Sequence, residues 1–196
     1  MAKFPPGAWD QLRNYFSKIA PISEGEFEDL KPSFTPSYFP RNSFLLRQGE
    51  LCQSMYFVVK GSFRIFHIND SGQELTRYFA FENKFGTNLT SMIEGSPSVE
   101  NLQAVEPLFV LEIKKATFFQ LVETISQVNK IYRNILQNAY ITSQRRIYDL
   151  QGMSALDRLK WLLEQYPLIL SRIPSRLVAS YLGISQYTLS RLKSEL

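Results

Sequence analysis

The spacing of apolar residues changes twice along the chain, and this change restricts the fold more than any other feature. From about Pro36 to Ile113 the sequence consists of short apolar runs separated by turn residues. On both sides of this segment apolar residues recur every three or four positions, as in amphipathic helices. Short strands rich in Phe and Tyr, in such a succession, are typical of a sandwich, roll or barrel. We therefore predict an α+β protein in which helices flank a β-domain.

Helices are predicted on both sides of the β-segment. Two short helices precede it, and the second of these runs from Glu24 to Leu30. Two more follow it, one at residues 116–122 and a long one from about Ser126 to Leu150 that contains no Pro or Gly. Gly152 ends the long helix, and Ser154 is placed to cap the next one.

Turn residues divide the β-segment into strands. The clearest turn is Asn69-Asp70-Ser71-Gly72, whose residue types are typical of a hairpin loop between two strands. The strands are expected at residues 43–47, 55–59, 62–68, 75–79, 99–104 and 108–113.

Charge is distributed unevenly. Residues 1–125 contain 12 Lys and Arg against 14 Asp and Glu, whereas residues 126–196 contain 10 against 4. A basic C-terminal segment that follows a mildly acidic one suggests that the C-terminal segment binds a polyanion. The alternative is a basic helix that simply faces solvent.

Several function classes are excluded by what the sequence lacks. Cys52 is the only cysteine and His67 the only histidine, so the chain has neither an internal disulfide nor the ligands of a zinc finger. We expect no metal and no cofactor. The sequence also has no signal-peptide pattern and no run of about 20 apolar residues, so we expect a cytoplasmic protein that does not enter membranes.

The last 23 residues carry the most specific pattern. A short helix at residues 174–182 is followed by Gly183, which can adopt the positive φ of a tight turn. Ser185 then caps a second helix, from Gln186 to about Ser194. Ala179 is small enough to let the two helices cross closely, and Leu189 fills the angle between them. This spacing predicts a helix-turn-helix, in which Leu192 and Leu196 continue the buried stripe of the second helix.

The opposite face of the second helix is polar. Gln186, Tyr187, Ser190 and Arg191 are residue types that reach base edges and phosphates in a DNA major groove. Arg176 and Lys193 are expected to contact phosphates. The alternative is an ordinary helical hairpin with a polar face.

Four segments together resemble the Crp/Fnr family of bacterial transcription regulators. Residues 45–50 and 56–64 resemble its early and central strands, Phe85-Gly86 the start of its ligand-binding segment, and residues 178–191 its helix-turn-helix. The resemblance implies a cyclic-nucleotide-binding-like β-roll (jelly roll), a long dimerisation helix and a C-terminal helix-turn-helix. It implies a dimeric, sequence-specific regulator whose partners are double-stranded DNA and RNA polymerase.

By this resemblance, Gln186, Tyr187 and Arg191 face base edges, while Ser185 and Thr188 hold phosphates. Tyr187 departs from the family, because many members have Glu at this position. The chain also stops soon after the second helix, so we expect any β-wing to be short or missing.

The ligand-binding segment departs further. Nucleotide-binding members follow Phe-Gly with a Glu for the ribose and then place an Arg against the cyclic phosphate. Here Thr87 and Asn88 follow Phe85-Gly86, and Ser98 lies near the position of the Arg. A phosphate needs donors and a positive field, which this segment lacks. We expect a pocket lined by Phe85, Gly86, Thr87, Asn88 and Ser98 that does not bind cyclic AMP and whose effector is unknown.

The predicted domains are a β-roll sensor at residues 1–125, a dimerisation helix at 126–150 and a DNA-binding domain at 151–196. The long helix has an apolar stripe that we expect to form the dimer seam, and the alternative is that it packs on the β-domain of its own chain. The stripe consists of Val128, Ile131, Tyr132, Ile135 and Ala139.

Two other functions remain as alternatives. The chain could be a cyclic-nucleotide-binding module whose basic C-terminal domain docks on protein. An enzyme on a cupin-like roll would hold its metal with several histidines, and the single His67 argues against it. We find no activated nucleophile pair and no phosphate-binding Gly-rich loop, so we do not expect an enzyme.

Overall fold

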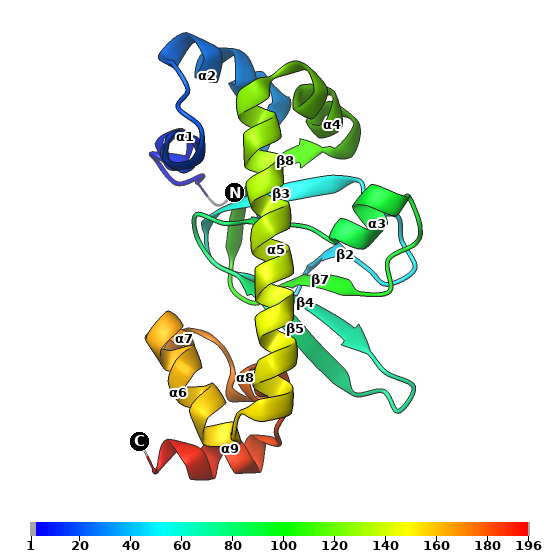
Figure 1. Cartoon of the computed structure of the whole chain (residues 1–196), viewed down its shortest axis with the longest axis vertical. Helices are drawn as coiled ribbons and strands as arrows, with labels where there is room; N and C mark the ends of the chain where they lie inside the picture. Colours follow the sequence, from blue (N-terminus) through cyan, green and yellow to red (C-terminus); the bar gives the residue numbers. More distant parts are fainter. Residues whose placement is uncertain (1–2, 196) are drawn as a thin grey trace. The chain divides into compact units, whose positions relative to one another are not determined.

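The computed structural model describes residues 3–195, which form a mixed α and β protein (Figure 1). Helices lie before and after the β-segment in the chain, as the apolar spacing predicts. No helix within the described residues is both long and apolar enough to cross a membrane. The helical elements are α1 (Ala8–Ile19), α2 (Glu24–Leu30), the 3-10 turn η1 (Lys31–Ser33), α3 (Leu89–Glu94), α4 (Lys115–Thr124), α5 (Ser126–Gly152), α6 (Ala155–Gln165), α7 (Ile169–Arg172), α8 (Ser175–Leu182) and α9 (Gln186–Lys193).

The strands form two four-stranded sheets, ordered β1-β8-β3-β6 and β2-β7-β4-β5. The core is made of side chains from both sheets, among them the fully buried Phe57, Phe63, Leu102 and Leu111. This arrangement confirms the predicted β-roll. The strands are β1 (Phe34–Phe39), β2 (Phe44–Leu46), β3 (Ser54–Lys60), β4 (Phe63–Ile68), β5 (Glu74–Ala80), β6 (Phe85–Gly86), β7 (Asn101–Ala104) and β8 (Leu108–Lys114).

Three elements of the β-segment differ from the sequence prediction. Strand β1 contains Pro36 and pairs with β8 at the end of its sheet, a position where the missing N–H of proline does no harm. Strand β6 has only two residues, too few for a period to be read. Helix α3 begins at a cap in which the Asn88 side chain accepts a hydrogen bond from the N–H of Ser91.

The predicted hairpin loop between β4 and β5 is confirmed. The N–H of Gly72 donates to the carbonyl of Asn69 over 2.8 Å, and Gly72 has a φ of 78°. The side chain of Asn69 accepts bonds from the N–H groups of Ser71 and Gln73. These local bonds are the mechanism by which Asn and Gly favour turns.

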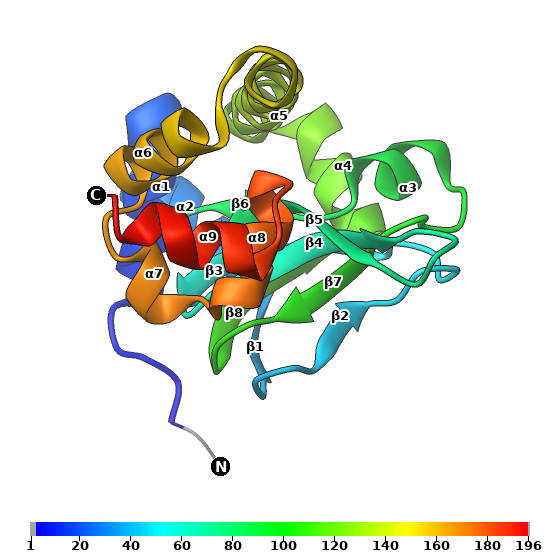
Figure 2. The same ribbon diagram turned by 90° about the horizontal axis from the view of Figure 1, so that it is seen from below.

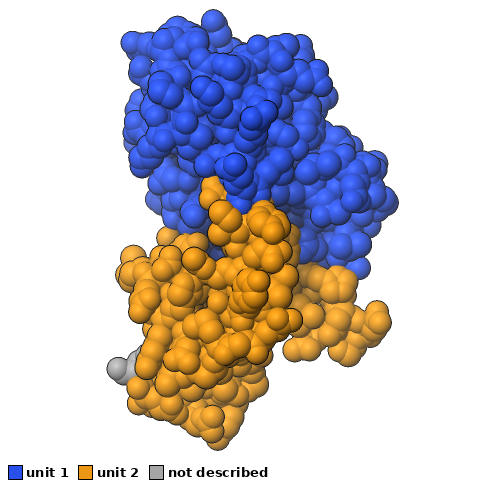
Figure 3. Space-filling model, in the orientation of Figure 1, with its two compact units in different colours: residues 1–65, 79–137 blue, residues 66–78, 138–196 orange. Residues whose placement is uncertain are grey.

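The described residues separate into two compact units (Figure 3). Unit 1 consists of residues 1–65 and 79–137, and unit 2 of residues 66–78 and 138–196. These units do not follow the predicted boundaries at residues 125 and 150. The end of the β4–β5 hairpin groups with the C-terminal helices, and α5 contributes its first half to unit 1 and its second half to unit 2.

The first turns of α5 pack inside unit 1. Val128 and Ile131 are 3% and 0% exposed. The Tyr132 ring lies 5.7 Å from the rings of Phe118 and Phe119 on α4. Packing within the chain therefore accounts for this part of the apolar stripe, and Val128 and Ile131 have no surface to offer a second copy. This corrects their assignment to the dimer seam; Tyr132, Ile135 and Ala139 are only half-buried.

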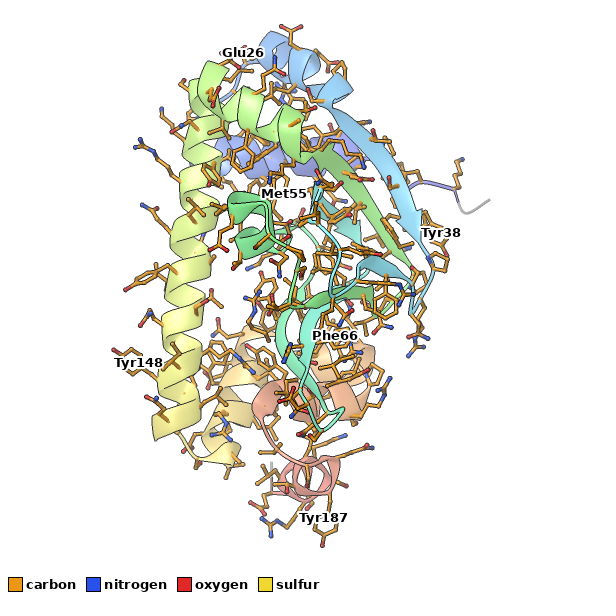
Figure 4. All side chains as sticks on the ribbon, turned by 90° about the vertical axis from the view of Figure 1, so that its right-hand side faces the viewer. Glu26, Tyr38, Met55, Phe66, Tyr148 and Tyr187 are labelled. Atoms are coloured by element: carbon orange, nitrogen blue, oxygen red, sulfur yellow. The ribbon has the colours of Figure 1, made fainter. Side chains whose placement is uncertain are left out.

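A different face of α5 is apolar and exposed. Tyr140 is 66% exposed and Tyr148 69%, and Ile141 and Ile147 are also exposed. Figure 4 shows Tyr148 pointing away from the helix. At about 100° per residue, these four side chains are centred on the side of α5 opposite the midpoint between Val128 and Ile131.

Candidate nucleic-acid interface

Helices α8 and α9 pack against each other as a helix-turn-helix (Figure 2). Gly183 between them has a φ of 68°, and its N–H donates to the carbonyl of Ser180. The N–H of Ile184 donates to the carbonyl of Ala179 over 3.1 Å. These two bonds form a Schellman motif, which ends α8 and sets the direction in which α9 begins.

Small and apolar side chains hold the two helices together. Ala179 is buried under α9, and Leu189 and Leu192 are buried on the other side of the contact. A Cβ at Gly183 would lie 3.2 Å from Cδ2 of Leu150 at the end of α5, so the turn also packs tightly. The predicted roles of Ala179, Gly183 and Leu189 are confirmed, and Leu196 lies outside the described residues.

The start of α9 is capped as predicted. The Ser185 hydroxyl accepts a hydrogen bond from the N–H of Thr188 over 3.0 Å. The two side-chain hydroxyls lie 2.8 Å apart and share a further hydrogen bond. Ser185 is exposed and Thr188 half-buried at the positive end of the helix dipole, a position that suits a phosphate.

The polar face of α9 is open to solvent. Tyr187 is 80% exposed, and Figure 4 shows it pointing away from unit 2. Gln186, Ser190, Arg191 and Lys193 are exposed as well. Arg191 lies 4.0 Å from the carboxylate of Glu195, just beyond the end of α9, a surface contact that a base or phosphate can displace.

Arg176, near the start of α8, is exposed but already has a carboxylate close by. Its guanidinium lies 3.6 Å from Glu74 on β5. Sequence reasoning could not find this pair, because the two residues are about a hundred positions apart. Both side chains belong to unit 2.

Sequence reasoning also missed Arg146 on α5. Its guanidinium donates to the carbonyl of Tyr181 over 2.7 Å and lies 4.3 Å from the Tyr181 ring. Burial raises the pKa of the Tyr181 phenol more than the neighbouring Arg146 lowers it, so the phenol stays neutral at physiological pH. Basic residues on a long helix are common, and no local pattern singles out this one.

The predicted ligand pocket lies in unit 1, and its first residues are tightly packed. Phe85 is buried against Phe57 and Tyr15, with ring centroids 5.1 and 5.3 Å away. A Cβ at Gly86 would overlap the ring of Phe63. The Phe-Gly pair therefore supports the core of the β-roll.

The polar residues of this segment bond to other parts of the protein. The Thr87 hydroxyl donates to the carbonyl of Ser54 and lies 3.0 Å from the thiol of Cys52. The Asn88 amide donates to the Glu100 carboxylate over 2.7 Å. All of these residues except Glu100, which is half-buried, are buried.

Ser98 lies near the position where nucleotide-binding members have an Arg. It is buried, and its hydroxyl donates to the carbonyl of Glu100 over 2.7 Å. The five predicted pocket residues thus come from one region of unit 1, and their polar atoms have protein partners. The nearest charged group among these bonds is a carboxylate, which repels a phosphate.

Comparisons with known proteins agree with this architecture. Residues 36–125 match the cyclic nucleotide-binding domain family. The chain is 29% identical over 156 residues to the transcriptional activator protein Anr of Pseudomonas protegens, covering 80% of this chain and 60% of that protein.

Solved structures share the fold. FixK2 from Bradyrhizobium japonicum has a TM-score of 0.75 at 17% identity, over 83% of this chain and 84% of that one. The global regulator CLP of Xanthomonas campestris has a TM-score of 0.68 at 19% identity, over 88% and 91% of the two chains.

The chain thus combines a cyclic-nucleotide-binding-type β-roll with a helix-turn-helix that follows it in the sequence. Together with the likeness to Anr, this combination agrees with the resemblance of the sequence to the Crp/Fnr family. The chain spans 60% of the length of that curated relative.

Proposed function

We propose that this protein is a dimeric, sequence-specific DNA-binding regulator of transcription whose sensor pocket does not take cyclic AMP. The observation that carries the proposal is the geometry of α9. Ser185 caps its start, its apolar side is buried against α8, and its polar side, from Gln186 to Lys193, faces solvent. Such a helix fits a major groove with its first residues at the base edges.

The charge of the C-terminal half supports DNA as the partner. Residues 126–196 contain 10 Lys and Arg against 4 Asp and Glu, and Arg176, Arg191 and Lys193 are exposed on the helix-turn-helix. Phosphate contacts supply most of the affinity of such proteins for DNA, and base contacts supply the specificity. RNA polymerase is the second partner that a regulator of this kind would bind.

Dimerisation is proposed through the exposed face of α5. Tyr140, Ile141, Ile147 and Tyr148 form an apolar surface on this helix that the described chain leaves open. An identical helix from a second copy would bury these residues in a symmetric interface. The dimer would present two copies of α9 to the DNA.

The pocket argument rests on the bonds around Asn88 and Ser98. In place of a cation that would attract a cyclic phosphate, the carboxylate of Glu100 lies 2.7 Å from the Asn88 amide. Binding cyclic AMP would require breaking buried hydrogen bonds without a compensating charge. The effector, if the protein has one, therefore differs chemically from a cyclic nucleotide.

The decisive experiment is selection of genomic fragments by the purified protein, followed by titration of a selected and a scrambled fragment at several salt concentrations. We expect a strong preference for the selected fragment and an affinity that falls steeply with salt. Lys160→Ala, which removes an exposed charge on α6 outside the helix-turn-helix, serves as control and should bind nearly as the wild type does. Absence of any selected fragment, together with tight binding of a cyclic nucleotide, would favour the protein-docking alternative.

A further inference from the structure

Strand β5 lies at the end of its sheet and so has one edge without a neighbouring strand. The N–H and C=O groups on such an edge need partners from elsewhere. Within unit 2, the side chain of Ser180 on α8 supplies two of these hydrogen-bond partners. Its hydroxyl donates to the carbonyl of Glu74 over 2.6 Å and accepts from the N–H of Thr76 over 2.9 Å. One side chain of the helix-turn-helix therefore bonds to the strand edge as a neighbouring strand would.

Arg146 on α5 completes this contact. Its guanidinium donates to the carbonyl of Thr76 over 3.0 Å and to the carbonyl of Tyr181 over 2.7 Å. The backbone of β5 and the backbone of α8 are thus joined through one half-buried cation. We call Glu74, Thr76, Arg146 and Ser180 the β5-edge contact.

The same contact places a carboxylate beside a residue proposed to bind DNA. Glu74 lies 3.6 Å from Arg176, and both side chains are partly exposed. An ion pair of this kind is weak, but the carboxylate lowers the positive potential where a DNA phosphate would approach. Docking of the hairpin and binding of a phosphate at Arg176 therefore oppose each other.

The contact also contains a feature that favours its release. Thr76 is 1% exposed, and its hydroxyl oxygen has no hydrogen-bond partner. Burying a hydroxyl without a partner is unfavourable, and water would satisfy it if the hairpin moved away. The β5-edge contact thus combines four hydrogen bonds with one penalty that its opening relieves.

We propose that the β5-edge contact is an autoinhibitory link, in which the β4–β5 hairpin of the sensor restrains the helix-turn-helix and lowers its affinity for DNA. The inhibitory role rests on the proposed DNA-binding function, whereas the contact itself can be tested without DNA. In a two-state equilibrium, the apparent dissociation constant is inversely proportional to the fraction of protein in the released, binding-competent state.

Two variants shift this equilibrium in opposite directions. Ser180→Ala removes both bonds from α8 to β5, and alanine keeps the helix intact because it has the highest helix propensity. We expect it to bind the selected DNA about threefold to tenfold more tightly, the effect of losing about one net hydrogen bond from the restrained state. Thr76→Val keeps the backbone bonds and the side-chain shape but removes the unsatisfied hydroxyl. It should tighten the contact and bind DNA more weakly.

The controls match each change. Ser171→Ala removes a serine bond on α7, outside the contact, and should leave DNA affinity unchanged. Glu74→Gln should strengthen DNA binding, whereas Asp70→Asn removes the same charge at the hairpin loop and should have a smaller effect. Hydrogen exchange of the residue 76 amide reports the contact directly: it should speed up in Ser180→Ala and slow down in Thr76→Val.

Each outcome decides the proposal. If Ser180→Ala leaves the exchange of the Thr76 amide unchanged, the link does not exist in solution. If exchange responds but DNA affinity falls or stays constant, the contact is structural and its inhibitory role is wrong. If exchange responds while neither wild type nor any variant binds DNA, the inhibitory role fails together with the proposed function, and the contact survives as a structural link.

Discussion

Arg191 is the residue on which sequence-specific reading is expected to depend most. Its side chain is exposed on the polar face of α9, and only Glu195, just beyond the end of this helix, lies within ion-pair distance in the described contacts. The planar guanidinium can bond both acceptors of a guanine in the major groove. The structure gives this side chain the access that such a contact needs.

Replacing Arg191 with Ala should therefore relax the preference at one base position of each half-site. We expect a loss of about 1–3 kcal/mol per half-site on specific DNA and little change on scrambled DNA. Lys193→Ala, a neighbouring phosphate contact, should weaken both DNAs alike and reduce the salt slope by about one unit. An equal loss for Arg191→Ala on both DNAs would show that Arg191 contacts the backbone.

Gly183 lies in the turn of the helix-turn-helix and makes its backbone conformation possible. Its φ of 68° is unfavourable for a residue with a Cβ, and that Cβ would press against Leu150 at 3.2 Å. We expect Gly183→Ala to lower the free energy of unfolding by about 1–2 kcal/mol. Thermal denaturation measures this loss.

Gly25→Ala is the matched control, because Gly25 lies inside α2 with open space around it and alanine should stabilise that helix. Equal melting temperatures for both variants would contradict the role of Gly183.

Among the elements, α5 has two apolar faces, which differ in whether the rest of the chain covers them. The face with Val128 and Ile131 is buried in unit 1, and the face with Tyr140 and Tyr148 is exposed. The apolar spacing near the start of the helix is therefore explained by its own chain. The proposed dimer seam therefore lies further along the helix than the sequence pattern indicated.

Ile141→Asp should dissociate the dimer, because it would place an unpaired charge in the apolar seam. Thr142→Asp introduces the same charge at the next exposed position, which points about 100° away around the helix, and should leave the dimer intact. Sedimentation equilibrium distinguishes the two. A dimer that persists in Ile141→Asp would move the seam to another face.

The segment from β6 to β7 is the element that we expect to determine which ligand the protein binds. Its polar side chains already bond to protein groups, and Glu100 adds a negative charge. Calorimetry with millimolar cyclic AMP should accordingly detect weak binding or none. A micromolar dissociation constant would mean that a cation from elsewhere reaches the pocket.

At the scale of the whole molecule, the proposed dimer sets the geometry of its target. Two copies of α9 would enter successive major grooves about 34 Å apart, on a pseudo-palindrome. Inserting about five base pairs between the half-sites turns one of them to the far side of the duplex and should abolish high-affinity binding. Inserting a full turn should restore part of the affinity. Binding that ignores both insertions would indicate that one copy binds alone.

The sequence by itself determined the features that depend on neighbours a few positions away. The change of apolar period separated the β-roll from its flanking helices. The caps at Ser154 and Ser185 and the turns at Gly72 and Gly183 were predicted correctly, because each rests on hydrogen bonds within about four residues. Strand β1 was missed because Pro36 argues against a strand unless its place at a sheet edge is known.

Only the tertiary structure decided which surfaces meet. Nothing near Ser180 in the sequence points to Glu74 and Thr76, which are 106 and 104 positions away. Likewise, an apolar stripe on α5 does not say whether the chain's own α4 or a second copy covers it. Periodicity gives the direction of a side chain relative to its own backbone, whereas its partner depends on how distant segments pack. For that reason the sequence was sufficient to predict α9, the helix proposed to contact bases, and the contact proposed to restrain it became visible only in the folded chain.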